Sequence, residues 1–139
     1  MKSLSAKCIV IFVGFLIFGY VEVWGADWRW FGSTPNSDAL FYDAGGITRQ
    51  PDAVVRVPVK RILSDKSRAD STGMHGKMHK DVDYQISLSE LDCKNKMARF
   101  LGTKLYSKED RLISSLGGID WEYIGPESAA AALFDKLCK

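Results

Sequence analysis

Residues 125–138 (GPESAAAALFDKLC), close to the carboxyl terminus, have the pattern of a short amphipathic helix. Pro126 suits a first helical turn, where its missing amide hydrogen would be unpaired in any case, and Glu127 adds negative charge at the positive end of the helix dipole. The alanines that follow favour helix. Apolar side chains then recur at the spacing of one helical face, namely Ala130, Leu133, Phe134, Leu137 and Cys138. The pattern predicts a helix whose apolar stripe includes the Cys138 thiol.

A helix this short is marginally stable alone, so it must pack on the rest of the chain. The upstream sequence has the features of short strands separated by tight turns at a spacing of about ten residues. We place six strands, at residues 27–32, 39–42, 53–63, 82–93, 97–106 and 111–116. Pro58 in the third strand indicates an edge position or a bulge, because it has no amide hydrogen to donate. We therefore predict an α+β fold, a six-stranded antiparallel β-sheet (meander) with one C-terminal α-helix packed on a face.

Residues 64–81 (SDKSRADSTGMHGKMHKD) lack periodicity and are rich in serine, lysine, aspartate and glycine. This composition predicts a mobile loop. His75 and His79 have the i, i+4 spacing that would place two imidazoles on one helix face for a metal ion, and Met74 and Met78 would suit copper. Gly73 and Gly76 oppose a helix, and only Asp81 or Asp83 could complete a ligand set. We predict a solvated loop without a metal ion.

Residues 1–25 have the features of a secretory signal peptide: two lysines, an uncharged apolar run and a small-residue exit before Ala26. The apolar run, residues 8–21, is shorter than the roughly 20 residues that a membrane-spanning helix needs. Cys8 begins this run, whereas a lipid-anchor cysteine would follow it, so we expect no acylation. Cleavage would leave residues 26–139 as one domain that does not span the membrane, exported to the periplasm, the outer membrane surface or the extracellular space.

Two cysteines, Cys93 and Cys138, remain after removal of the signal peptide. In an oxidising compartment we expect them to form a disulfide. A pair of metal thiolates or a redox site are the alternatives, but neither has the Cys-x-x-Cys spacing that is typical of such sites.

The charges of the mature chain are nearly balanced. The chain has 19 basic and 17 acidic residues, and the signal peptide removes two lysines and one glutamate, leaving 17 and 16. This balance gives no support for binding to nucleic acid or to an anionic membrane. Basic residues do gather in the third strand and the loop after it, and we take them as candidate partner-binding residues, namely Arg56, Lys60, Arg61, Lys66, Arg68, Lys77 and Lys80. The alternative is an edge strand that charge protects from aggregation.

Nothing in the sequence has the arrangement of a catalytic site or a cofactor site. Both histidines fall in the predicted loop, which would give a Ser-His or Cys-His pair no rigid support. The Gly-Gly pairs at 45–46 and 117–118 belong to turns and do not form a phosphate-binding loop. We predict a protein that is not an enzyme and has no cofactor.

Several segments together resemble the surface-adhesin E family of small exported bacterial proteins. They are Asp27-Trp28, Phe41-Tyr42-Asp43, the segment 90–94 (ELDCK), the segment 121–128 (WEYIGPES) and the closing Leu137-Cys138-Lys139. The resemblance covers essentially the whole mature chain. It implies an antiparallel sheet tethered by a disulfide to a C-terminal helix, an envelope or surface location and, for the members that named the family, adhesion to host extracellular proteins.

The sequence therefore predicts a non-enzymatic exported binding module that contacts another protein, extracellular or in the envelope. The expected contact surfaces are the basic segment from Arg56 to Lys80 and the face of the sheet that the helix leaves open, where aromatic side chains would also suit self-association into a homo-oligomer. The alternative is a periplasmic or outer-membrane accessory or structural subunit of the bacterium's own envelope assembly.

Overall fold

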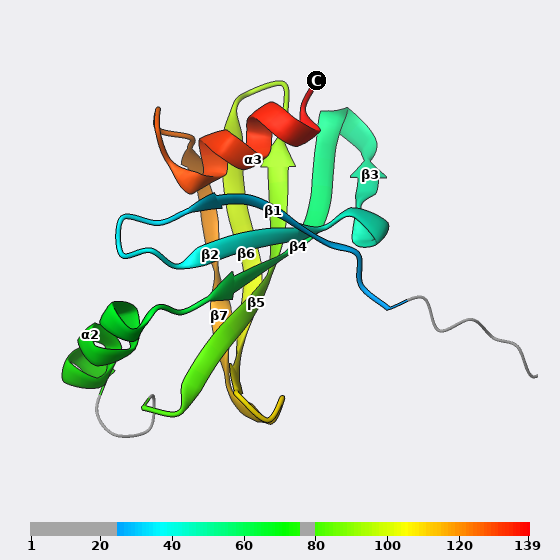
Figure 1. The fold of residues 1–139 in the computed structure, drawn as a ribbon. Coiled ribbons are helices and arrows are strands. Elements are labelled where there is room, and N and C mark those ends of the chain that lie inside the picture. The colour runs from blue at the N-terminus through cyan, green and yellow to red at the C-terminus, as the bar shows by residue number, and fades with distance from the viewer. Residues whose placement is uncertain (1–24, 76–79) are drawn as a thin grey trace, which may run out of the picture.

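The computed structural model describes residues 25–75 and 80–139, with the side chains of residues 71–75 left aside. Apart from Gly25, the predicted signal peptide lies outside the described residues, as do Lys77, Met78 and His79. The described chain forms one curved sheet with a helix, α3, across one of its faces and a second helix, α2, at its end (Figure 1).

Seven strands form the sheet, where the sequence predicted six. They are β1 (Trp28–Ser33), β2 (Ala39–Asp43), β3 (Thr48–Gln50), β4 (Val54–Ile62), β5 (Val82–Asp92), β6 (Met97–Ser107) and β7 (Leu112–Tyr123). The order across the sheet is β1-β2-β4-β5-β6-β7, β3 also pairs with β4, and the pairings are antiparallel. The predicted antiparallel meander is thus confirmed, and the strand count was too low by the three-residue β3.

One edge of β4 is shared by two short strands. β3 pairs with its first part, ending at Thr48 opposite Arg56, and β2 pairs with its second part, beginning at Tyr42 opposite Val59. Pro58 lies between these two pairings, where an amide hydrogen is not needed. This local edge agrees with the edge position or bulge that the sequence predicted for Pro58. β4 as a whole is an interior strand between β2 and β5, so the interpretation of its basic residues as protection of an edge was wrong.

The strand β7 is longer than predicted, because it continues through the Gly-Gly pair that we expected to end it. The register between β6 and β7 shifts just beyond this pair, from Ala98 opposite Glu122 to Phe100 opposite Ile119. Gly118 lies next to this shift, and a Cβ atom on it would come within 2.5 Å of the Phe100 carbonyl oxygen. The glycine therefore allows two backbones to approach closely inside a strand and does not mark the strand's end.

The helix α2 (Asp65–His75) occupies much of the segment predicted as an irregular loop, so that prediction was wrong for residues 65–75. The Ser64 hydroxyl accepts a hydrogen bond from the Ser67 amide (3.1 Å), which caps the first turn. Asp65 adds a carboxylate to that turn, and it forms an i, i+3 ion pair with Arg68. The helix lacks an apolar stripe, and periodicity therefore could not reveal it.

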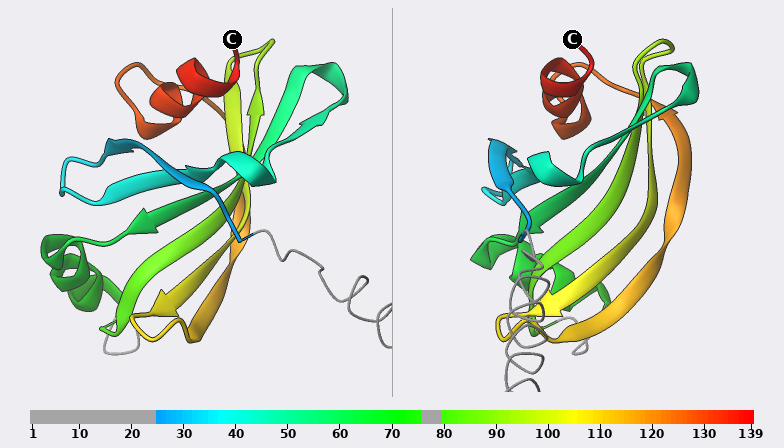
Figure 2. Two further views of the ribbon diagram at one scale, coloured as in Figure 1. Left: turned by 45° about the vertical axis from the view of Figure 1, so that its right-hand side comes forward. Right: turned by 90° about the vertical axis from the view of Figure 1, so that its right-hand side faces the viewer.

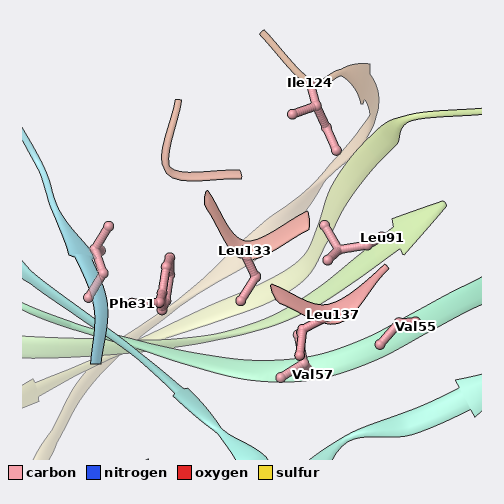
Figure 3. Packing of buried hydrophobic residues seen from close by; sticks show 8 residues of the cluster. Phe31, Val55, Val57, Leu91, Ile124, Leu133 and Leu137 are labelled. Atoms are coloured by element: carbon pink, nitrogen blue, oxygen red, sulfur yellow. The ribbon is translucent and has the colours of Figure 1, made fainter. Parts of the chain in front are cut away.

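The helix α3 (Ala129–Leu137) lies on the concave side of the sheet (Figure 2). It begins later than predicted, because the Ser128 hydroxyl, which accepts from the Ala131 amide, is the N-cap. Pro126 and Glu127 precede the helix in a turn, where Glu127 adopts a φ of 60°. The predicted apolar stripe is confirmed: Leu133 and Leu137 are buried in the core (Figure 3) with Phe31, Leu40, Val55, Val57, Leu91 and Ile124.

A disulfide joins the end of α3 to the sheet, as predicted. Cys93 directly follows β5, Cys138 is the C-cap of α3, and their Cα atoms are 5.3 Å apart. The predicted cysteine pairing is confirmed, and the alternatives of a metal thiolate pair or a free redox pair are set aside.

Loss of the disulfide is expected to lower the free energy of unfolding by about 4 kcal/mol, because the bond closes a loop of 45 residues in the unfolded chain. The measurement is urea unfolding of the mature protein and of the double variant Cys93→Ser, Cys138→Ser. Reduction of the wild-type protein should reproduce the effect, and a change below about 1 kcal/mol would contradict the role of this bond as the main tether of α3.

Gly118→Ala is expected to destabilise the protein by about 1–3 kcal/mol, since the new methyl group would collide with the backbone of β6. Gly117→Ala is a matched control, because a Cβ atom there has nothing within 4 Å. Thermal unfolding of the two variants compares them directly. Equal destabilisation at the two positions would show that the close backbone approach at Gly118 does not contribute to stability.

Candidate binding surface

The face of the sheet opposite α3 is the candidate binding surface, and we call it the outer face. Directly paired residues of antiparallel strands point to the same side, so the register assigns each side chain to a face. Val57 and Leu91, which pack against α3, define the concave face. Pro58 follows Val57, and Leu88 lies three residues before Leu91, so these two residues, which pair with each other, belong to the outer face.

A shallow apolar hollow of about 450 Å³ lies on the outer face over the middle of β5 and β6. Its aliphatic lining comes from Pro58, Ile86, Leu88, Leu101 and Leu116. Leu88 and Leu101 are 36% and 38% exposed, which is high for leucines in interior strands of a sheet. Apolar side chains held in one exposed cluster are typical of a surface that contacts a partner.

A row of charged side chains crosses the outer face beside this hollow. Glu90 is only 3% exposed and lies between two arginines. Its Oε1 accepts from Arg99 Nε (2.8 Å) and its Oε2 from Arg56 Nη2 (3.1 Å), while the Arg99 guanidinium also lies 4.5 Å from the Trp121 ring. Burial disfavours the charged form of Glu90, but the bonds and charges of Arg99 and Arg56 outweigh it, so the pKa of Glu90 lies below its ordinary value.

A second row, of aromatic side chains, lies beyond the other end of the hollow. Tyr84 and Tyr106 stack with ring centres 5.0 Å apart, and the Lys60 ammonium group lies 4.3 Å from the Tyr84 ring. The Tyr84 hydroxyl donates to the Asp110 carboxylate (2.7 Å). Burial and this bond to a carboxylate raise the pKa of Tyr84 to about 12, so the ring is uncharged at physiological pH and attracts the lysine by its π-face alone.

The seven predicted partner-binding residues do not form one surface. Arg56 and Lys60 lie on the outer face, where both already contact neighbours. Arg68 forms ion pairs with Asp65 and Asp83 near α2. Lys66 is exposed on α2, Lys80 is exposed in the turn before β5, and Lys77 lies outside the described residues.

Arg61 points to the concave side, where it pairs with Asp38. The Asp38 carboxylate has no exposed surface and also accepts from the Ser64 amide (2.7 Å) and the Ser67 hydroxyl (2.9 Å). Burial opposes the charge of Asp38, but these donors together outweigh it and lower the pKa of Asp38. The Arg61 guanidinium therefore fixes the start of α2 to the sheet, and this places it apart from the outer face.

Neither a metal centre nor a membrane helix is present in the described part of the chain. Within residues 25–75 and 80–139, no three histidine, cysteine, aspartate or glutamate side chains gather as a metal site would require. His75 ends α2, and its predicted companion His79 is outside the described residues. None of the described helices is long and apolar enough to cross a membrane.

The family model described as surface-adhesin protein E matches residues 28–139, which is nearly all of the described chain. The protein is a member of the surface-adhesin protein E family. Two solved structures of Haemophilus influenzae protein E share its fold. The selenomethionine form has a TM-score of 0.53 at 11% identity, and covers 82% of this chain and 90% of that chain. A second form has a TM-score of 0.51 at 12% identity, with coverages of 82% and 88%. Comparison with curated proteins gives no match.

Membership of this surface-adhesin family supports an adhesin-like role at a cell surface. Two of the segments that resemble the family, residues 90–94 and 121–128, lie close together in the structure. Residues 90–94 supply both Glu90 of the buried ion-pair row and Cys93 of the disulfide, and Trp121 packs on Arg99 of the same row. These segments therefore build both the tether of α3 and one border of the outer face.

Sequence reasoning had missed most of the outer face. The register places Tyr84, Ile86, Leu88 and Glu90 on one face of β5, as the alternation of a strand requires. The sequence alone could not show that Glu90 pairs with Arg99 or that Leu101 lies near Leu88, because these contacts depend on a register shift at Leu88 and Ser89.

Glu90→Gln is expected to lower the free energy of unfolding at pH 7 by about 2 kcal/mol, because two charge-assisted hydrogen bonds are weakened. The folded-state pKa of Glu90 lies below its ordinary 4.5. The stabilisation is therefore complete above that value and is lost as the pH falls through the folded pKa. The measurement is urea unfolding of both proteins at pH 7, 5 and 3.

The difference between wild type and Glu90→Gln should shrink between pH 5 and pH 3. Glu122→Gln, at an exposed position of β7, is the matched control and should change stability little at any of these pH values. A difference that stays constant with pH would contradict the assignment of this stabilisation to the ionised carboxylate.

Proposed function

We propose that this protein is a non-enzymatic adhesin, exposed at the bacterial surface, that binds a protein partner through its outer face. The observation that carries the proposal is the open apolar hollow on the outer face of a chain in a surface-adhesin family. The concave face is partly covered by α3 and buries the core, whereas the leucines of the outer face remain exposed.

The charges around the hollow indicate the chemistry of the partner. Lys60 and Lys104 flank Ile86 directly in the register, and Arg56 and Arg99 lie in the row beyond Leu88. Two acidic residues are set against these four cations: Glu90 is buried beneath Arg56 and Arg99, and Asp110 is bonded to the Tyr84 hydroxyl. The outer face therefore favours a protein segment in which carboxylates flank an apolar side chain.

The two buried carboxylates of the described chain have structural partners. The carboxylate of Glu90 is committed to two arginines and that of Asp38 to Arg61 and two serines, so neither is available as a general base. A binding module needs only a stable scaffold and an accessible surface, both of which this sheet supplies.

Lys104→Glu is expected to weaken partner binding about tenfold. The variant loses the attraction between the lysine and the carboxylates of the partner, and the new glutamate repels them. Lys108→Glu is the matched control, since Lys108 is also exposed but lies in the turn after β6. Leu101→Ser should likewise weaken binding, while Ile119→Ser, an apolar position of the concave side with 53% exposure, should not. The measurement is binding of fluorescently labelled mature protein to epithelial monolayers with their extracellular matrix, and to isolated envelope from the source bacterium.

Binding to the monolayer with the expected order of variants, together with loss of the protein when intact cells are treated with protease, would support the adhesin. Binding to the envelope alone, with protection from protease, would instead favour an accessory subunit of the bacterium's own envelope. If Lys104→Glu and Lys108→Glu bind equally well, the outer face is not the contact surface.

A further inference from the structure

A second, separate cavity lies on the concave side of the sheet, between the strands and α3. Its volume is about 260 Å³. Phe31 of β1 and Ala130 and Leu133 of α3 form its cover, and Figure 3 places Phe31 and Leu133 side by side above the sheet. The floor is formed by concave-face residues of β4, β5 and β6, so the cavity does not share the hollow of the outer face.

The floor of this cavity is partly polar. Ser87 and Thr103, which pair across β5 and β6, join their hydroxyl groups in a hydrogen bond of 2.8 Å. Ser89, two residues along the same strand, is 3% exposed, and its Oγ has no hydrogen-bond partner among the described residues. Buried hydroxyl groups in native proteins are nearly always paired, and leaving one unpaired is unfavourable, so Ser89 is a group that a bound molecule would satisfy.

The charge of the lining selects an uncharged molecule. Arg61 and Arg99 also border the cavity, but their guanidinium groups are neutralised by the buried carboxylates of Asp38 and Glu90. The remaining polar groups are hydroxyls and the Gln85 amide, which bind neutral donors and acceptors. An ionised ligand would lose its hydration without gaining a partner of opposite charge.

The size of the cavity limits the ligand further. An apolar cavity of about 150 Å³ in another protein holds benzene, so a cavity of this size has room for one substituted ring or two fused rings. Its entrance lies towards β7, where Phe100 and Ile119 line the cavity and remain 40% and 53% exposed. A small molecule can therefore reach the floor without unfolding α3.

We propose that this cavity binds a small uncharged amphiphile, a compact apolar ring system that carries one hydroxyl group, with the hydroxyl bonded to Ser89 Oγ. Because serine both donates and accepts, a ligand hydroxyl can take either role. This site is independent of the proposed protein-binding role, since it lies on the opposite side of the sheet and its ligand would bond to Ser89, which does not face the outer side.

The test uses two probes that differ only in the hydroxyl group, 4-ethylphenol and ethylbenzene. Each is titrated into isotope-labelled mature protein, residues 26–139, and binding is followed by chemical-shift changes of backbone amides. In the wild-type protein, 4-ethylphenol should bind about tenfold more tightly than ethylbenzene, with the largest changes at Ser89, Ala130 and Leu133. In the Ser89→Ala variant the two probes should bind about equally tightly.

Two kinds of variant serve as controls. Ser115→Ala makes the same substitution on the outer face, where Ser115 pairs with Lys104, and it should keep the tenfold preference. Ala130→Phe should fill the cavity and abolish binding of both probes, and Ala130→Val, a milder filling that is easier to accommodate, should weaken both. The folded state of each variant is checked by its own amide spectrum.

The proposal is overturned if neither probe gives saturable shifts at millimolar concentration, which would leave water as the partner of Ser89. It is equally overturned if the preference for 4-ethylphenol persists in Ser89→Ala, or if the shifts map to the outer face. Because the monolayer-binding experiment uses neither probe, failure of one proposal can be told apart from failure of the other.

Discussion

The structure depends on the docking of one nine-residue helix against the concave side of a sheet. A helix of this length is marginally stable by itself, so its position must come from packing and from a covalent tether. Leu133 and Leu137 supply the packing, and the Cys93–Cys138 bond supplies the tether. Cys93 directly follows β5, which lies between β4 and β6 in the interior of the sheet. The helix is thus fixed to an interior strand, which is hydrogen-bonded to a neighbour on each side.

This docking makes the two faces of the sheet different. On the concave side, Val57 and Leu91 are fully enclosed by α3 and β1. On the outer side, the alternate residues of the same strands have no covering element in the described chain, and Leu88 and Leu101 remain partly exposed. The short segment 90–93 serves both sides at once, because Glu90 lies in the charged row of the outer face, Leu91 lies in the core and Cys93 holds α3. A sheet face that is apolar, bordered by cations and left open suits contact with another protein.

The sequence allowed the helix, the disulfide and the antiparallel order of strands to be predicted, because each depends on a local pattern. The apolar residues from Ala130 to Cys138 have the spacing of one helical face. Outside the predicted signal peptide, Cys93 and Cys138 are the two cysteines, so each has one possible partner. The helix α2 was missed because it is held by capping and charge: Ser64 caps it and Asp38, far away in sequence, binds Ser64 and Ser67. Such a helix has no apolar face from which periodicity could reveal it.

The candidate site was harder to predict than the fold, and β4 explains why. Arg56, Lys60 and Arg61 stand close in the sequence and were taken as one basic surface. Side chains alternate along a strand, so Arg61 falls on the opposite face from the other two. There it neutralises a buried carboxylate, whereas Arg56 covers Glu90 and Lys60 lies over an aromatic ring. Charge counting along the chain treats these three cations as equivalent, although each has a different partner.

The same alternation explains why β5 contributes hydroxyl groups to the concave cavity and aliphatic side chains to the outer hollow. Going along β5, Ser87 and Ser89 point into the concave cavity, while Ile86 and Leu88 point into the outer hollow. Over residues 86–89 the polar side chains thus face the covered side and the apolar side chains face the open side, the reverse of the usual arrangement of a sheet with one buried face. A strand that faced only water on its outer side would favour the opposite order. The reversal is explained if both sides are used, with the hydroxyls available to a small molecule beneath α3 and the leucines available to a protein on the outer face.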